Sequence, residues 1–274
     1  MMKLEVLLSC MNQRVDALVQ RSRLTGDAVV INQCDEDSCV QFPTENGTAR
    51  VFSVRQRGLT RSRNMAIRQA RADVCLLCDD DEVFLPGYEE KILTAWESLP
   101  QADVLVFKIL DRPVSFPDRV TRLRFPRTMK VSSPQISFRR ERLLRAGVYF
   151  DELLGAGTGN GAEEELKFLT DCERAGLRIY YVPVEIASVV QSESTWFHGY
   201  TETFFENRGA TTRYILGAGI ASAYAVYYVL RKKSMYRDTI SPVRALRATL
   251  RGIRENKIGK QAAEVNRRGE GVRN

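Results

Sequence analysis

Two runs of acidic residues in this sequence have the types and spacing needed for catalysis. Asp79-Asp80-Asp81-Glu82 directly follows the apolar run 74–78, which predicts a strand that is buried on both faces. Four carboxylates at one strand end repel one another unless a positive partner lies among them. A hard divalent cation is the natural partner. A solvated acidic turn is the simpler alternative.

The second run, Glu163-Glu164-Glu165, opens a helix predicted over residues 163–175. A glutamate here can act as a general base if its surroundings raise its pKa toward the working pH. Because the first turn of a helix also stabilises negative charge, simple capping electrostatics is the alternative reading.

Strands and helices alternate over residues 1–110, which predicts an α/β fold with a mixed, mostly parallel sheet flanked by helices. The strands are expected at 4–9, 28–33, 49–54, 74–78 and 104–110, with a loop over 35–48. The helices between them are expected near 12–24, 59–72 and 88–99. Beyond residue 110, strands are expected at 135–139, 177–182 and 185–190, with helices at 141–146, 163–175 and from 201 onward.

Polar side chains follow three of the predicted strands. In open α/β sheets, ligands bind beyond the carboxyl ends of the strands, so polar groups at one edge predict a nucleotide-type site with a metal close by. The residues expected to line this site are Ser9 and Asn12, then Asn32, Gln33 and Asp35, and finally Asp79, Asp80 and Asp81.

The order of these pieces resembles the family 2 glycosyltransferases of GT-A fold, a Rossmann-like nucleotide-binding fold. Residues 57–92, RGLTRSRNMAIRQARADVCLLCDDDEVFLPGYEEKI, look like that family's Arg-Asn helix, D-x-D strand end and Pro-Gly turn. Residues 161–183, GAEEELKFLTDCERAGLRIYYVP, resemble its acidic helix start. The resemblance spans roughly residues 3–215. It implies inverting, metal-dependent sugar transfer from a nucleotide-diphosphate sugar.

The resemblance also implies a role for individual carboxylates. Asp81 would be the ligand of Mg²⁺ or Mn²⁺, and Asp79 would contact the ribose of the donor or pair with an arginine, for which Arg63 is the best candidate. Glu165 falls where the family has its catalytic Asp, and Glu164 falls on the preceding Glu. Either glutamate could therefore be the base that activates the acceptor hydroxyl.

Two positions depart from the family pattern. Residues 32–35 read Asn-Gln-Cys-Asp where the family usually has Asp-Asp-Gly-Ser, so the base of the nucleotide stays open, with a UDP-sugar favoured. No histidine follows the predicted strand at 185–190, and the chain's single histidine, His198, is expected to be a surface or packing residue. A metal site with so few protein ligands is expected to bind mainly through the phosphates of the donor.

The expected organisation is a glycosyltransferase domain over 1–210, with a donor half about 1–110 and an acceptor half about 111–210. A helical extension over 211–256 and a polar tail over 257–274, expected to be disordered, follow. Residues 214–230 carry no charge but, as a helix, span only about 26 Å, which is short of the roughly 30 Å core of a bilayer. A helix that packs on the domain or lies near a membrane is expected.

Residues 241–256 combine helix signals with an apolar stripe beside a basic one. Ser241-Pro242 predicts an N-cap and a first helical residue. Two adjacent stripes follow along the predicted helix. The apolar stripe is Val243, Leu246, Leu250 and Ile253, and the basic stripe is Arg244, Arg247, Arg251 and Arg254. This pattern fits a helix at an anionic membrane surface. A helix packed on its own domain, with solvated arginines, is the alternative.

Charge and targeting signals restrict the class of protein. Residues 231–274 carry 13 Lys and Arg against 4 Asp and Glu, so their net charge is +9, whereas the whole chain is 41 − 34 = +7. The basic character belongs to the C-terminal part, and no nucleic-acid partner is expected. Because no secretory signal is visible, we expect a cytoplasmic protein, peripheral at the inner face of the cell membrane.

The function that fits best is sugar transfer to a hydroxyl of a glycan or lipid-linked acceptor, in the biosynthesis of capsule, exopolysaccharide or another surface glycan. A nucleotidyltransferase is one alternative, but the segment 9–12 is not the Gly-, Arg- or Lys-rich loop that it would need. A module that binds nucleic acid through the basic tail is another alternative.

Overall fold

The computed structural model describes residues 1–110, 116–160, 163–190 and 199–270. Its chain divides into two compact units, the first made of Met1–Asp151 and Glu164–Glu193, and the second of Glu152–Glu163 and Ser194–Asn274. The boundary expected near residue 210 differs from this division, because the described residues 152–160 and 199–210 belong to the second unit.

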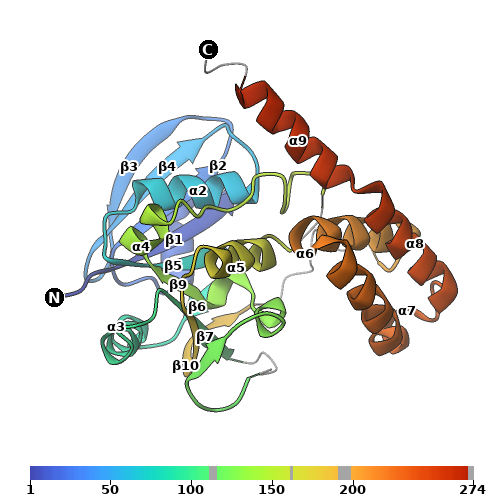
Figure 1. Ribbon diagram of the computed structural model, residues 1–274. Helices are drawn as coiled ribbons and strands as arrows, with labels where there is room; N and C mark the ends of the chain where they lie inside the picture. Colours follow the sequence, from blue (N-terminus) through green and yellow to red (C-terminus); the bar gives the residue numbers. More distant parts are fainter. Residues whose placement is uncertain (111–115, 161–162, 191–198, 271–274) are drawn as a thin grey trace. The chain divides into compact units, whose positions relative to one another are not determined.

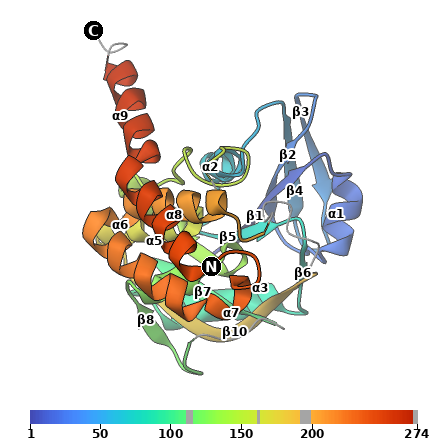
Figure 2. The same cartoon turned by 90° about the vertical axis from the view of Figure 1, so that its right-hand side faces the viewer.

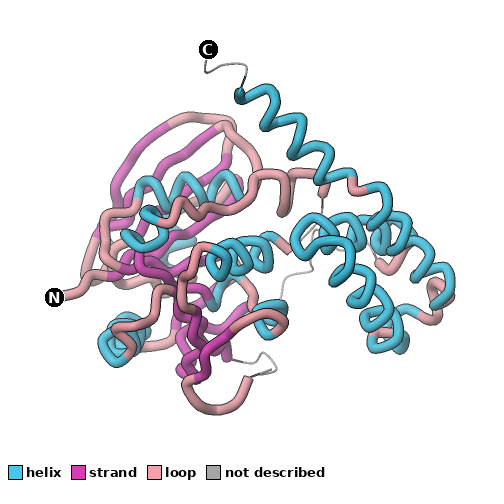
Figure 3. The backbone as a smooth tube through the Cα atoms, viewed as in Figure 1, coloured by secondary structure: helices cyan, strands magenta, loops and turns pink. Residues whose placement is uncertain are grey.

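The first unit is built on one mixed sheet (Figure 3). Its strands are β1 (Leu4–Met11), β2 (Ala28–Gln33), β3 (Ser38–Pro43), β4 (Thr48–Val54), β5 (Val74–Asp79), β6 (Glu82–Phe84), β7 (Val104–Leu110), β8 (Thr121–Leu123), β9 (Ile136–Arg139) and β10 (Ile179–Val189). The strand order is β3-β4-β2-β1-β5-β9-β7-β10-β6, and β8 pairs with β10. Strands β4, β2, β1 and β5 run parallel to one another.

Helices cover both faces of this sheet (Figure 1). They are α1 (Val15–Arg21), α2 (Leu59–Gln69), α3 (Tyr88–Ser98), α4 (Arg140–Arg145) and α5 (Glu164–Arg174). Leu18 of α1 and Trp96 of α3 pack in one core cluster, whereas Ile67 of α2 and Phe168 of α5 pack in another. Since alternate residues of each central strand enter opposite clusters, nearly every strand residue is buried. This explains the continuous apolar runs of the sequence.

The structure confirms the predicted α/β class and most of the elements, and it differs at three places. β3 forms an edge of the sheet where a loop was expected, and nearly all its residues are exposed, so it has no apolar periodicity to predict it. β6 is a strand of only three residues at a place where no strand was expected. β10 is one strand that continues through Pro183, with register shifts against β7, where two separate strands were expected.

The second unit is helical. It contains α6 (Glu202–Arg231), α7 (Lys233–Tyr236), α8 (Pro242–Glu255) and α9 (Lys257–Glu270), and α6 is interrupted at Gly217, whose φ is 81°. Helix α8 packs along α6 (Figure 2). The two backbones approach closely, since a Cβ added to Gly252 would lie 2.0 Å from the carbonyl oxygen of Glu206.

Helix α8 packs on α6, as in one of the two arrangements that its stripes allow. Ser241 is indeed the N-cap and Pro242 the first helical residue. However, the buried face consists largely of small side chains, while Val243 and Leu250 are exposed. Two arginines of the basic stripe form ion pairs with α6, Arg244 with Glu202 at 2.5 Å and Arg251 with Glu206 at 2.5 Å. The alternative, a helix packed on its own unit, is therefore the observed arrangement.

The tail also differs from expectation. Residues 257–274 were expected to be disordered, but Lys257–Glu270 form α9. Ile258 is fully buried, and Gln261 accepts a hydrogen bond of 2.9 Å from the side chain of Asn160. Lys257 Nζ also donates to Asn207 Oδ1 of α6 at 2.6 Å, so one buried apolar residue and two polar contacts hold the start of this helix. No helix in the part of the chain that the structure describes has the length and apolar character to cross a membrane.

Candidate functional site

The three polar strand ends meet at one edge of the sheet, as the sequence predicts. Ser9 pairs with Asp79 across β1 and β5, and one residue further along β1, Cys10 pairs with Asn32 of β2. Because β1 is the middle strand of the three, its polar end lies between the other two. The structure thereby brings the predicted residues into one region.

Arg63 lies at the centre of this region, in α2, with only 2% of its surface exposed. Its Nη2 donates to Asp79 Oδ1 at 2.9 Å, and its Nη1 lies 3.3 Å from Glu165 Oε1 and 3.5 Å from Glu164 Oε1. The guanidinium also lies over the ring of Phe150, 5.3 Å from its centroid. One buried cation therefore joins the two acidic runs, which are about 85 residues apart in sequence.

Helix α2 is placed so that its polar side faces the strand ends. Gly58, with φ 119°, precedes the helix, and its amide donates to Gln33 Oε1 at 2.7 Å. One turn later, Ser62 Oγ donates to Ser9 Oγ at 2.8 Å. Thus Ser9 and Gln33, predicted as nucleotide-binding residues, also anchor the helix that carries Arg63.

The following residue, Asn64, holds the segment that leads toward the second acidic run. Its side-chain nitrogen donates to the carbonyl of Phe150 at 2.9 Å, and its oxygen accepts from the amide of the same residue at 2.8 Å. This paired bond fixes Phe150, whose ring stacks on Phe168 of α5 at 4.4 Å. The Arg-Asn pair of α2 therefore supports α5, which starts with the glutamates.

Burial sets the charge state of the glutamates. It raises the pKa of Glu164 to about 8, with a further rise from Glu165 and an opposing effect of Arg63. Burial also raises the pKa of Glu82 well above its usual range, and the charge of Asp79 adds to that rise. Burial lowers the pKa of Arg63, but the surrounding carboxylates outweigh it and the net shift is upward. Arg63 is thus charged, while Glu164 keeps its proton at neutral pH.

The third glutamate of the run is separated from the other two. Glu163 has a positive φ of 86°, an unusual conformation for a side chain with a Cβ, and belongs to the second unit. Its carboxylate pairs with Arg208 of α6 at 2.8 Å. The guanidinium of Arg208 lies over the ring of Tyr228, 4.1 Å from its centroid. Glu163 is accordingly a structural anchor, and the catalytic candidates are Glu164 and Glu165.

Asp80 and Asp81 lie in the turn between β5 and β6. The carboxylate of Asp80 accepts from Gln13 Nε2 at 3.2 Å, and its carbonyl accepts from Arg21 Nη2 at 3.3 Å. Burial, followed by the charge of Asp79, raises the pKa of Asp80. The carbonyl of Asp81 accepts from the amide of Val190 at 2.9 Å, which pins the turn against the end of β10. Both carboxylates are half-buried.

The remaining predicted residues have different surroundings. The side chain of Asn32 is engaged with Gln13, accepting from its amide at 3.1 Å and donating to its carbonyl at 3.0 Å, so it shapes the loop after β1. Asn12 in that loop is exposed, with φ 51°. Asp35 is exposed and pairs with Arg57 at 2.6 Å. Of these three, Asn12 and Asp35 are directly accessible to a ligand.

Sequence reasoning missed two residues of the site, Ser133 and Gln13. Ser133 Oγ donates to Asp79 Oδ2 at 2.5 Å, so both oxygens of Asp79 are engaged, one by Arg63 and one by the serine. Ser133 lies in a short 3₁₀ turn far along the chain, in an irregular segment with no periodic signal. Gln13 lies next to the predicted Asn12, but its contact with Asp80 requires the folded turn.

The family follows from the sequence match. The model of the family described as "Glycosyl transferase family 2" matches residues 5–151, more than half of the chain. The chain belongs to glycosyl transferase family 2. It is also 22% identical, over 146 residues, to an "Uncharacterized glycosyltransferase" of Haemophilus influenzae, covering 48% of this chain and 49% of that protein. The chain thus spans about half the length of this curated relative.

Solved structures agree with the family on the fold. The structure titled "Crystal structure of S. aureus TarS 1-349 in complex with UDP-GlcNAc" has a TM-score of 0.57 and 18% identity, covering 87% of this chain and 74% of that one. A longer structure of S. aureus TarS has a TM-score of 0.55 and 17% identity, covering 86% of this chain and 44% of that one. At this identity the likeness concerns the fold, and it confirms the predicted GT-A class.

The carboxylates at the end of β5 are the candidate ligands for the metal ion that the family resemblance implies. Among the described residues, no three His, Cys, Asp or Glu side chains are grouped as a ready cage for a metal ion. Asp79 is engaged by Arg63 and Ser133, so Asp81 and Asp80 are the candidate ligands. One or two carboxylates fit a hard cation that takes its other ligands from phosphates and water. His198 lies outside the described residues.

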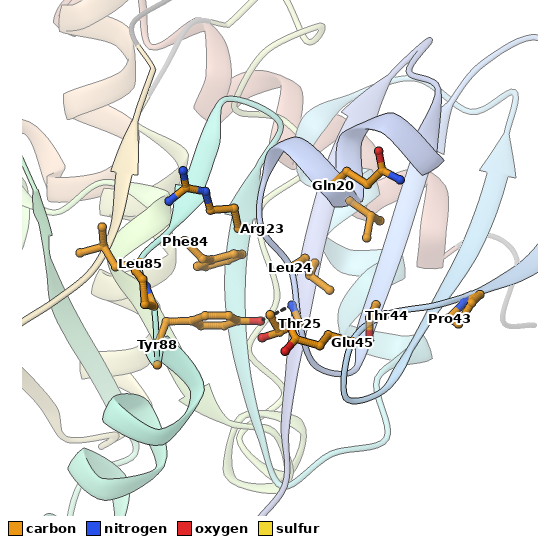
Figure 4. Close-up of a pocket in the computed structure, with 13 residues that line it drawn as sticks. Gln20, Arg23, Leu24, Thr25, Pro43, Thr44, Glu45, Phe84, Leu85 and Tyr88 are labelled. Carbon is orange, nitrogen blue, oxygen red and sulfur yellow. Dashed lines mark hydrogen bonds between the residues drawn. The ribbon is translucent and has the colours of Figure 1, made fainter.

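A cavity of about 530 Å³ in the first unit is distinct from this acidic region (Figure 4). It is lined by the end of α1, the β3–β4 turn and the start of α3, including Arg23, Thr44, Phe84 and Tyr88. The hydroxyl of Tyr88 accepts a hydrogen bond of 3.3 Å from the backbone amide of Thr25, and both residues line the cavity. None of the predicted site residues lines this cavity.

Proposed function

We propose that this protein transfers a sugar from a nucleotide-diphosphate sugar to a hydroxyl of a glycan or lipid-linked acceptor, with inversion at the anomeric carbon. The observation that carries the proposal is the contact of one buried arginine, Arg63, with both acidic runs. Membership of glycosyl transferase family 2 supports the reaction class. The TarS structure with UDP-GlcNAc supports a UDP-sugar as the donor class.

The donor would bind across the strand ends. Asp79 is held in position by Arg63 and Ser133 and is 28% exposed, so it still presents a carboxylate face to a ribose hydroxyl. Asp81, with Asp80 beside it, would hold Mg²⁺ or Mn²⁺ together with the diphosphate. When bound, such a cation would neutralise the charge that develops on the leaving nucleoside diphosphate. Asn12 and Asp35 are the accessible groups nearest the expected position of the base.

Glu164 and Glu165 would have different roles at the acceptor hydroxyl. The side chain of Glu165 is 18% exposed and that of Glu164 is 7% exposed, so Glu165 is the more accessible. With its pKa raised to about 8, Glu164 stays protonated at neutral pH and cannot accept a further proton. We therefore propose Glu165 as the base that accepts the acceptor proton.

Two isosteric substitutions test this division. Glu165→Gln should lower the rate of sugar transfer by about 10²- to 10⁴-fold. It should keep the Mn²⁺-dependent binding of UDP, which is measured by thermal shift. Glu164→Gln resembles the protonated glutamate and should keep most of the activity at neutral pH. Release of UDP from a panel of UDP-sugars, with purified glycans as acceptors, is the assay. Normal turnover by Glu165→Gln would remove Glu165 from the role of base.

We also propose that the acceptor belongs to capsule, exopolysaccharide or another surface glycan, because the ordered motifs resemble glycosyltransferases of that kind. Sugar analysis of the surface glycans of a strain that lacks the protein is the test. An unchanged glycan profile in that strain would remove this assignment without touching the reaction class.

A further inference from the structure

The second half of α6 presents an uninterrupted apolar face to solvent. None of the exposed residues between positions 218 and 230 is charged, and their only polar side-chain group is one tyrosine hydroxyl. These exposed residues are Ala218, Gly219, Ile220, Ala223, Val226, Tyr227 and Leu230. Leu230 is 67% exposed and Tyr227 60% exposed. At about 1.5 Å per residue, this face runs for roughly 18 Å along the helix. We call these seven residues the apolar face of α6.

This exposure is a property of a well-packed helix. The opposite side of the same segment is buried, with Ala221, Ala225, Tyr228 and Val229 in contact with other helices of the second unit. Ser222 turns its hydroxyl back to the carbonyl of Ala218 at 2.9 Å. Large exposed apolar side chains grouped on one side of an ordered helix mark a surface that binds something apolar.

Basic side chains follow directly at the end of this face. Arg231, Lys232 and Lys233 are exposed, and within the described part of the chain no ion pair involves them. Residues 218–237 contain four Lys and Arg and not a single Asp or Glu. Met235, 54% exposed, extends the apolar surface past the three cations. The local charge is therefore purely positive next to a purely apolar face.

We propose that the apolar face of α6 and the cations 231–233 dock on an anionic lipid membrane, with the helix in the plane of the interface. Apolar side chains then enter the boundary between headgroups and acyl chains, while the cations contact anionic headgroups. The tyrosine hydroxyl stays at headgroup level. This surface differs from the stripe on α8 that the sequence indicates, because two arginines of that stripe are paired with Glu202 and Glu206.

Charge complementarity favours lipid over a second copy of the chain. In a two-fold symmetric dimer the same patch faces itself, and the patch contains no carboxylate that could pair with the three cations of the partner. Like charges would then meet at a desolvated interface, which is unfavourable. An anionic bilayer supplies both the apolar phase and the negative charge.

The test is sedimentation of the full chain with vesicles of phosphatidylcholine alone or mixed with phosphatidylglycerol. Wild type should sediment with the mixed vesicles and stay in solution with phosphatidylcholine. Because each Lys or Arg contributes about fivefold to binding at an anionic surface, the triple variant Arg231→Gln/Lys232→Gln/Lys233→Gln should bind roughly 100-fold more weakly. Leu230→Gln with Val226→Gln should weaken binding without unfolding the protein, since both side chains are exposed.

A matched control removes three cations elsewhere in the same unit. Arg247→Gln/Arg254→Gln/Lys260→Gln has the same net charge as the first triple variant and alters exposed residues outside the proposed surface. It should bind the mixed vesicles nearly as well as wild type. Equal loss in both triple variants, no binding by wild type, or a concentration-dependent dimer that Leu230→Gln dissolves would each overturn the proposal. The measurement needs no sugar donor, so its failure leaves the proposed transfer reaction untouched.

Discussion

Arg63 and Asp79 form a buried ion pair, with Nη2 and Oδ1 at 2.9 Å, between helix α2 and the end of strand β5. The second terminal nitrogen of the same guanidinium faces Glu165 at 3.3 Å. A planar guanidinium can contact two carboxylates in fixed directions, whereas an ammonium acts as a single point charge. The pair thus fixes the distance between the proposed donor-binding aspartate and the proposed base.

Two replacements of Arg63 should distinguish the effect of its positive charge from the effect of its two-sided contact geometry. Arg63→Ala leaves Asp79 and Glu165 without their shared counter-charge and should cost about 3–5 kcal/mol of unfolding free energy. Arg63→Lys keeps the charge but loses one of the two contacts, so it should fold and lose most of its transfer activity. Urea denaturation and UDP release are the measurements. Arg68→Ala, on the exposed side of the same helix, is the control and should change neither quantity strongly.

The protonated state of Glu164 predicts an upper limit to the pH range of activity. Above a pKa of about 8, Glu164 ionises and places a second negative charge beside Glu165. Binding of the diphosphate donor should weaken there, and the rate should fall as pH rises through this value. In Glu164→Gln the fall should disappear, because glutamine cannot ionise. A wild-type profile that still rises well above pH 8 would contradict this assignment.

Stability should depend on pH through the same residue. The folded pKa of Glu164 is raised from 4.5 to about 8, so the folded state binds a proton that the unfolded state releases over this range. The contribution to stability is complete below pH 4.5 and is lost as pH rises through about 8. Melting temperatures measured across this interval should fall for wild type relative to Glu164→Gln. Parallel curves would show that Glu164 does not hold its proton.

Close contact between α6 and α8 predicts opposite effects of two glycine substitutions. Gly252→Ala would place its Cβ 2.0 Å from the carbonyl oxygen of Glu206, so we expect a loss of about 1–3 kcal/mol from overpacking. Gly219→Ala meets nothing within 4 Å and should stabilise the helix by up to about 1 kcal/mol. Chemical denaturation followed by circular dichroism distinguishes them. Equal effects would mean that the two helices do not pack this closely.

The sequence predicts the central strands well because their apolar runs reflect burial on both faces, as in 28–33 and 74–78. The polar strand ends follow from those strands, so the meeting of Ser9, Asn32 and Asp79 could be foreseen. Edge strand β3 could not, because an exposed strand has no alternating pattern.

Contacts between residues that are distant in the sequence could not be predicted from local sequence patterns. Ser133 bonds to Asp79 across 54 positions, and nothing near Ser133 indicates that it would. The raised pKa of Glu82 and of Glu164 likewise depends on burial that exists only in the folded chain. The contact face of α8 could not be predicted either, because small residues, not large ones, make the closest contact with α6.

The most direct test of the account is calorimetric titration of UDP into wild type and Asp81→Asn, each with and without Mn²⁺. We predict that wild type binds UDP well only when Mn²⁺ is present, and that Asp81→Asn loses this metal-dependent part of the binding. Asp37→Asn, an exposed aspartate paired with Arg55, is the matched control and should behave like wild type. Equal UDP affinity in all samples, with no effect of Mn²⁺ or of Asp81→Asn, would contradict the proposed metal–nucleotide site.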